Sequence, residues 1–269
     1  DLLDVLARCA RRSRRIPREL VLYIMMEVLK GLDFAHNASD DFGSSYNIVH
    51  RDVSPSNVLL SYSGNVKVGD FGIAKSQLQS SMTEIGTQKG KMGYMSPEQV
   101  TGDPIDRRSD IFAASVIFFE MLSMARLFKA KNDLDVMLKI RDGKIEEDMR
   151  KLRGLPDDLI AILRKGLAVE PTQRFQTAEA YHDALQEFVF RNELKVGARG
   201  LEAFMRETFA DRIAQEVRTR RDDPSYDQVV DEVEAVGGRI EEPMFRYRDD
   251  EGRIHGPMSH DMLVELLES

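Results

Sequence analysis

Hydrophobic positions near the N-terminus recur at intervals of three and four residues, which is the period of an amphipathic helix. The repeat follows Pro17, a residue suited to the first turn of a helix. We therefore predict a helix here with one wide buried face. Its apolar members are Leu20, Val21, Ile24, Met25, Val28, Leu29, Leu32 and Ala35.

The same pattern predicts helices further along the chain. Residues 111–122 are apolar nearly all round, which is typical of a helix surrounded by others. Pro156 precedes another periodic segment, and Thr177 can cap the next one. Residues 201–217 are amphipathic and highly charged, and the polar stretch 218–225 is the predicted linker.

Two short apolar runs, 58–60 and 66–68, predict a hairpin, with Gly64 available for a left-handed turn position. If the turn lies at Ser63–Gly64, Asn57 and Asp70 face each other at its open end. A turn at Gly64–Asn65 would shift this register. The aperiodic residues 75–101 predict a long loop. The fold class is therefore mainly α, or α+β when the hairpin is included.

Composition excludes several classes of protein. With 42% hydrophobic and 31% charged residues, the 269-residue chain is not a disordered protein. A formal charge of -8 argues against a nucleic-acid partner, because phosphate contacts need surplus Lys and Arg. The single Cys9 excludes internal disulfides and favours a cytoplasmic location. Residues 111–122 are too few to cross a bilayer, so we expect no membrane segment.

Three motifs carry residues suited to phosphate chemistry: His50-Arg51-Asp52, with Asn57 five positions after the aspartate, Asp70-Phe71-Gly72, and Ser96-Pro97-Glu98. Oxygen ligands from Asn57 and Asp70 at one end of a hairpin would suit Mg2+. Asp52, just upstream, could accept a proton from an attacking hydroxyl.

In this order, the motifs resemble those of the eukaryotic-type protein kinases of bacteria. Residues 50–57 resemble their catalytic loop, 70–72 their metal-binding motif, and 93–98 the end of their activation segment. Asp110 and Arg174 resemble two scaffold residues of the family. The resemblance covers residues 1–190 and implies the helical large lobe of the kinase fold, with a small β-hairpin.

The resemblance also implies roles for individual residues. Asp52 would deprotonate the substrate hydroxyl, while Asn57 and Asp70 would bind Mg2+ that bridges the phosphates of ATP. Arg51 would pair with a phosphate on the activation segment, for which Thr83 or Thr87 is the expected acceptor. Pro55 and residues 94–98 resemble the serine/threonine branch. The expected partner is therefore a protein substrate that carries Ser or Thr hydroxyls.

The glycine-rich loop and strand lysine of the kinase small lobe are not found in this sequence. We therefore expect the chain to be the large lobe of a longer kinase, inactive by itself. The alternative is a catalytically dead, kinase-like module that binds other proteins.

A second departure concerns charge. Ser54 occupies a position where kinases of this branch usually have lysine, and Lys91 a position where they usually have threonine. We predict that Lys91 supplies the missing cation as a catalytic residue; otherwise it is an ordinary loop lysine.

The remaining segments are less distinctive. Residues 191–240 are predicted to be a helical extension and linker. Residues 241–269 resemble the start of a bacterial GYF-like domain, which implies a peptide partner, although an ordinary hairpin-helix tail also fits. A basic run near the N-terminus could dock acidic partners, but a solvated helix face is the simpler prediction. This run consists of Arg8, Arg11, Arg12, Arg14, Arg15 and Arg18.

Overall fold

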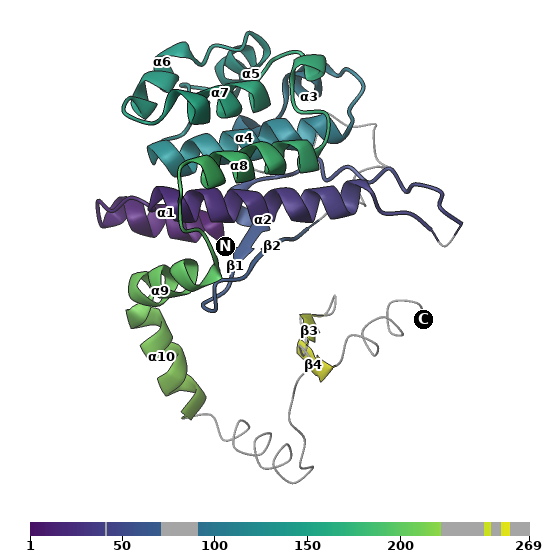
Figure 1. Cartoon of the computed structure of the whole chain (residues 1–269). Helices are drawn as coiled ribbons and strands as arrows, with labels where there is room; N and C mark the ends of the chain where they lie inside the picture. Colours follow the sequence, from purple (N-terminus) through teal and green to yellow (C-terminus); the bar gives the residue numbers. More distant parts are fainter. Residues whose placement is uncertain (41, 71–90, 222–244, 249–253, 259–269) are drawn as a thin grey trace. The chain divides into compact units, whose positions relative to one another are not determined.

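The computed structural model describes residues 1–40, 42–70, 91–221, 245–248 and 254–258. The chain divides into two compact units, residues 1–210 and 211–269. The first unit is helical, with one two-stranded antiparallel sheet (Figure 1). Its longer elements are α1 (Leu2–Arg11), α2 (Arg18–His36), β1 (Val58–Leu60), β2 (Val66–Val68), α4 (Arg107–Ser123), α5 (Asp133–Arg141), α7 (Asp157–Gly166), α8 (Ala178–Arg191) and α9 (Ala198–Thr208).

Short helical elements connect these. They are η1 (Pro55–Asn57), η4 (Met92–Tyr94), α3 (Pro97–Thr101), α6 (Glu146–Met149), η5 (Arg150–Leu152) and η6 (Pro171–Gln173). The second unit holds most of α10 (Ala210–Arg221) and the antiparallel pair β3 (Phe245–Arg248) and β4 (Ile254–Met258). Among the described residues, we find no helix that combines the length and the apolar character needed to cross a membrane.

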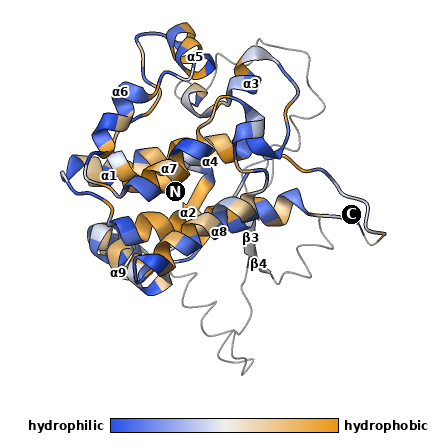
Figure 2. Cartoon of the chain, turned by 45° about the horizontal axis from the view of Figure 1, so that its top comes forward, coloured by the Kyte–Doolittle hydropathy of each residue, from blue (hydrophilic) through white to orange (hydrophobic). Residues whose placement is uncertain are grey.

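The core of the first unit is a stack of α2, α4 and α8, which lie side by side in Figure 1. Every residue of α4 from Ser109 to Ser123 is buried, which confirms the predicted central helix. The predicted apolar face of α2 is buried as well, and hydrophobic residues cover much of this helix in Figure 2. Thr177 caps α8 through a 3.0 Å hydrogen bond from Ala180 N, as predicted.

The register predicted for the hairpin is wrong by one residue. Val58 pairs with Val68 and Leu60 with Val66, so the loop is centred on Ser63. Gly64 takes the left-handed conformation, with φ 83°, as is typical of a three-residue hairpin loop. Asn57 therefore pairs with Gly69, whose N–H donates to Asn57 O at 2.9 Å, and Asp70 lies one residue beyond.

Two other predictions need correction, and a third lies outside the described residues. Residues 91–101 are not all loop, because they form η4 and α3. The amphipathic segment 201–217 divides between α9 and α10, and α10 continues to Arg221, four residues into the predicted linker. The proposed phosphate acceptors Thr83 and Thr87 lie outside the described residues, as does the helix expected near the C-terminus.

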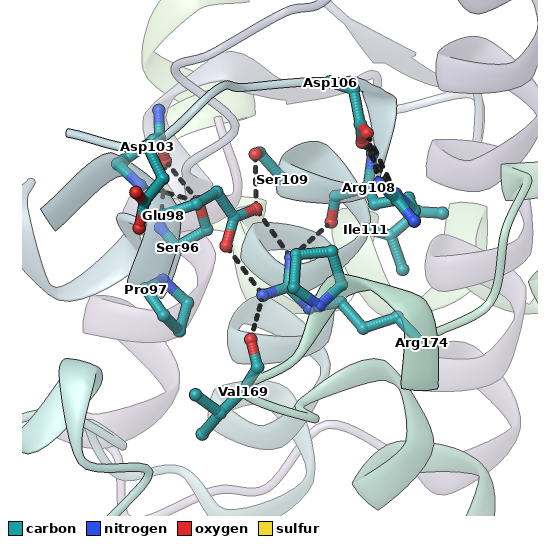
Figure 3. Close-up of polar contacts among 12 residues, drawn as sticks. Ser96, Pro97, Glu98, Asp103, Asp106, Arg108, Ser109, Ile111, Val169 and Arg174 are labelled. Atoms are coloured by element: carbon teal, nitrogen blue, oxygen red, sulfur yellow. Dashed lines mark hydrogen bonds and ion pairs between the residues drawn. The ribbon is translucent and has the colours of Figure 1, made fainter. Parts of the chain in front are cut away.

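A buried ion pair fixes α3 to the helical core (Figure 3). Arg174 donates from both terminal nitrogens to the two oxygens of Glu98, each at 2.7 Å, and Ser109 Oγ donates to Glu98 Oε1. The same guanidinium donates to the carbonyls of Ala168 and Val169. Arg174 is 2% exposed, so all of these bonds are shielded from water. Burial by itself would raise the pKa of Glu98, but the bonds from Arg174 and Ser109 outweigh it and lower that pKa.

We expect Arg174→Met to lower the free energy of unfolding by about 3–5 kcal/mol, because it leaves the Glu98 carboxylate buried without its partner. Urea denaturation measures this. The control is Arg191→Ala, which removes an exposed ion pair with Glu187 and should cost about 0–1 kcal/mol. A loss for Arg174→Met as small as that of the control would contradict this account.

The lowered pKa of Glu98 also sets the direction of a pH effect. As the pH falls through the ordinary carboxyl range, Glu98 takes up a proton in the unfolded state before it does so in the folded state. The stabilisation that the Glu98–Arg174 pair contributes is therefore lost on acidification.

Candidate active site

One buried carboxylate binds the backbone at the start of the candidate catalytic loop. Asp110, at the start of α4, is 1% exposed. Its Oδ2 accepts a hydrogen bond from His50 N at 2.8 Å, and its Oδ1 accepts one from Arg51 N at 2.9 Å. His36, the last residue of α2, places Nε2 2.7 Å from the same Oδ2. Two helices far apart in the sequence thus hold the first residues of the loop.

The loop turns sharply at Arg51, which has a positive φ of 65°. A residue with a side chain adopts this conformation only at some cost, and surrounding contacts must stabilise it. Those contacts are the Asp110 carboxylate on Arg51 N and the Gln99 amide, which donates to Arg51 O at 3.0 Å. Gln99 belongs to α3, so the loop is also tied to the segment that Glu98 anchors.

Asp52 and Lys91 form an ion pair across the site. Lys91 Nζ lies 2.8 Å from Asp52 Oδ2, and the side chains are 31% and 20% exposed respectively. Lys91 directly precedes η4, so this pair joins the candidate catalytic loop to the segment that leads to α3.

Asn57 is held rigidly at the open end of the hairpin. It is 4% exposed, and its Nδ2 donates to Asp52 O at 2.8 Å. Its Oδ1 accepts a hydrogen bond of 3.3 Å from Ser56 Oγ. The amide orientation is therefore set by the loop itself, and the side-chain oxygen is the group left to serve as a ligand.

Asp70 follows Gly69, the backbone partner of Asn57, and is exposed with a positive φ of 56°. His50 Nε2 lies 2.9 Å from Gly69 O, so the loop also fixes the residue before Asp70. The two predicted ligands, Asn57 and Asp70, thus both lie at the open end of the hairpin, although its register differs by one residue from the prediction. An amide oxygen and a carboxylate fit Mg2+, which prefers oxygen ligands and completes its shell with phosphate and water.

A second polar chain lies behind η4. Tyr94 OH donates to Glu120 Oε2 at 2.7 Å and accepts from Arg126 Nη1 at 2.7 Å. Burial raises the pKa of Tyr94, so its hydroxyl remains protonated and continues to donate. Burial also raises the pKa of Glu120, although Arg126 and Tyr94 oppose this effect. These contacts fix the backbone of η4 next to Lys91.

Sequence reasoning missed two residues of the site. His36 stands in the period of α2 and gave no separate signal, yet it contacts Asp110. Leu59 was assigned only to a strand, but it is 50% exposed two residues after Asn57. Nothing in the sequence marked Leu59, because its exposure is known only from the structure.

A family model described as "Protein kinase domain" matches residues 2–185. The chain is 40% identical over 211 residues to the "Tyrosine-protein kinase MasK" of Myxococcus xanthus, covering 78% of this chain and 33% of that protein. It is 32% identical over 163 residues to the "Serine/threonine-protein kinase PrkC" of Bacillus subtilis, covering 61% and 24%. With the "Serine/threonine-protein kinase PknB" of Mycobacterium leprae it shares 33% identity over 165 residues, covering 61% and 25%.

The chain spans about a third or less of the length of these curated relatives. The family match ends at residue 185. These matches give no support to the GYF-like resemblance of residues 241–269, which stays a prediction. On the described residues of that segment, β3 and β4 form an antiparallel pair.

We expect Asp110→Asn to loosen the candidate catalytic loop without unfolding the core. An amide can accept from only one of the two N–H groups that the carboxylate now binds, so the other loses its partner at a cost of about 1–3 kcal/mol. Hydrogen exchange at the amides of His50 and Arg51 measures this directly. The control is Asp133→Asn at the exposed start of α5, which should leave both rates unchanged. Unchanged exchange in Asp110→Asn would mean that other contacts hold the loop.

Proposed function

The chain belongs to the protein kinase family and has the helical fold of its large lobe, and on that premise we propose that the intact protein transfers the γ-phosphate of ATP to Ser or Thr hydroxyls of proteins. The observation that carries this proposal is the constellation around Asp52. Its carboxylate pairs with Lys91, its carbonyl accepts from Asn57, and its loop is anchored on Asp110. We propose that the chain without a small lobe does not perform the reaction efficiently, since the transfer depends on positioning ATP.

In this mechanism Asp52 orients the substrate hydroxyl and takes up its proton as the new O–P bond forms, while the bond from the γ-phosphorus to the bridging oxygen breaks and ADP leaves with that electron pair. A carboxylate suits this role because it accepts hydrogen bonds and stays ionised at neutral pH. The Asn57 amide holds the carbonyl of Asp52 in place, and the Lys91 ammonium holds the carboxylate. The group that moves the proton is therefore fixed at both its backbone and its side chain.

Asn57 and Asp70 would hold Mg2+, which supplies charge neutralisation for the phosphate groups of ATP when it is bound. The fixed amide of Asn57 and the exposed carboxylate of Asp70 support this assignment. Leu59 would contribute an apolar surface beside them for the base of the nucleotide.

Lys91 would place its ammonium next to the phosphate during transfer. It would replace the lysine that kinases of this branch usually have at the position of Ser54. Ser54 is 2% exposed, and its hydroxyl contacts Ser56 Oγ at 3.0 Å. Because this hydroxyl is uncharged, Ser54 cannot supply the cation. A fixed cation is effective in such a partly buried site because nothing has to reorganise during the reaction. Lys91 meets this condition, since its ion pair with Asp52 already orients it.

The choice of acceptor hydroxyl is part of the proposal. PrkC and PknB are named serine/threonine kinases, whereas MasK is named a tyrosine kinase. Pro55 and residues 94–98 favour the serine/threonine branch. Regulation by a phosphate on Thr83 or Thr87, with Arg51 as the expected counter-charge, remains a prediction, because both threonines lie outside the described residues.

We expect Asp52→Asn and Asp70→Asn to lower turnover of the intact protein by roughly 100-fold or more, since the first removes the proton acceptor and the second a metal ligand. Transfer of labelled phosphate to an acceptor protein measures this, and acid hydrolysis of the product should yield phosphoserine and phosphothreonine. His255→Ala, outside the family match, serves as the control. Retention of most activity by both aspartate variants would leave the binding module as the better account, and phosphotyrosine would overturn the specificity.

The role of Lys91 is tested by a double-mutant cycle in the intact protein. We expect Lys91→Thr to weaken transition-state stabilisation by about 3 kcal/mol, and Ser54→Lys added to it to restore much of that loss. Steady-state kinetics of the parent, the two single variants and the double variant give the coupling energy. A near-neutral Lys91→Thr, or a folded double variant without recovery, would mean that Lys91 has no part in the transfer.

A further inference from the structure

The basic run at the N-terminus is only in part the solvated face that the sequence predicts: Arg11, Arg12 and Arg15 are exposed, yet three arginines of the run contact α9. Arg8 Nε and Arg12 Nη1 both donate to Thr208 O, at 2.7 and 3.1 Å, and Arg14 Nη2 lies 2.7 Å from Glu207 Oε2. Thr208 is the last residue of α9, where helix carbonyls lack intrahelical partners and carry partial negative charge. Three arginines at the end of α1 therefore bind the C-terminal end of α9.

Apolar packing completes this contact. Leu201, Phe204, Met205 and Phe209 are buried, and the guanidinium of Arg8 lies 4.7 Å from the centre of the Phe209 ring. Residues beyond the family match thus form a continuous part of the first compact unit, which extends to residue 210. Figure 1 shows α9 below α1 and beside the turn of the hairpin.

The turn of the hairpin contacts the same helix. A Cβ atom at Gly64 would lie 2.2 Å from Ala198 O, so only glycine allows this approach. The Tyr62 and Phe209 rings lie 6.1 Å apart between centroids. From the opposite side, Tyr23 OH in α2 donates to Gly64 O at 3.2 Å. The turn is thus held between α9 and α2.

These contacts connect α9 to the candidate active site in two ways, through the hairpin and through α1. The hairpin has its turn on α9 and carries Asn57 and Asp70 at its open end. Helix α1, which binds α9 through its arginines, also contacts β1 and η1, and η1 ends at Asn57. Displacement of α9 would therefore remove its contact with the turn and its bonds to Arg8 and Arg12, while the packing of β2 on α2 would remain.

We propose that α9 is a latch that holds the hairpin against α1 and so sets the position of Asn57 and Asp70. The consequence for nucleotide binding rests on the proposed function, whereas the latch itself does not. The latch is built so that it can be released, because the Thr208 hydroxyl is buried and has no hydrogen-bond partner among the described residues. A valine of the same shape would bind more firmly there, so the docking is weaker than the site allows.

Hydrogen exchange on the full chain tests the latch with variants that act in opposite directions. Arg8→Ala/Arg12→Ala should speed exchange about ten-fold or more in both α9 and residues 61–65, as local opening becomes easier. Thr208→Val should slow it in both segments. The matched control is Arg11→Ala/Arg15→Ala, which removes two exposed arginines from the same run and should change neither. Residues 111–122 of α4 are the internal reference for global unfolding.

Faster exchange in α9 with unchanged exchange in residues 61–65 would overturn the proposal, since the helix would then dock without holding the hairpin. Unchanged exchange in both segments would overturn it as well. If the arginine variant also opens the α4 reference, Thr208→Val decides: slower exchange in α9 alone contradicts the latch.

Activity separates this proposal from the proposed function. In the intact protein, Arg8→Ala/Arg12→Ala should raise the KM for ATP while the control variant leaves it unchanged. If the exchange results hold but no variant, the parent included, transfers phosphate, the proposed function fails and the latch stands.

Discussion

The geometry of the candidate site depends on one buried carboxylate. Asp110 binds the N–H groups of His50 and Arg51, and through them it stabilises a turn with a positive φ that the loop could not keep by itself. The turn at Arg51 therefore sets the path of the residues that follow it in the loop, including Asp52 and Asn57. A buried, unpaired carboxylate would be costly, so anchor and loop stabilise each other.

The second half of the site is positioned from a different part of the core. Glu98 and Arg174 fix α3, the Tyr94–Glu120–Arg126 chain fixes η4, and Lys91 then reaches Asp52. Gln99 joins the two halves by donating to Arg51 O. The buried Glu98–Arg174 pair that stabilises the fold and the partly buried Asp52–Lys91 pair of the candidate site are therefore separate groups.

The C-terminal boundary of the lobe has a similar logic. The family match stops at residue 185, but α9 supplies three buried apolar residues, Phe209 just after it supplies a fourth, and the end of α9 binds Arg8 and Arg12. The extension is thus packed against the elements that carry the candidate metal ligands. A signal acting on the C-terminal part of the chain would have a short physical route to them.

The sequence by itself determined the helices α2, α4, α7 and α8, the presence of the hairpin and the order of the motifs, because periodicity, capping residues and glycine act locally. It also identified Lys91 as unusual. The hairpin register, off by one residue, needed the loop geometry at Ser63 and Gly64. Only the tertiary structure decided which charged groups meet. The sequence does not show that Arg8 and Arg12 donate to Thr208 O or that His36 contacts Asp110, because such contacts join residues far apart in the chain.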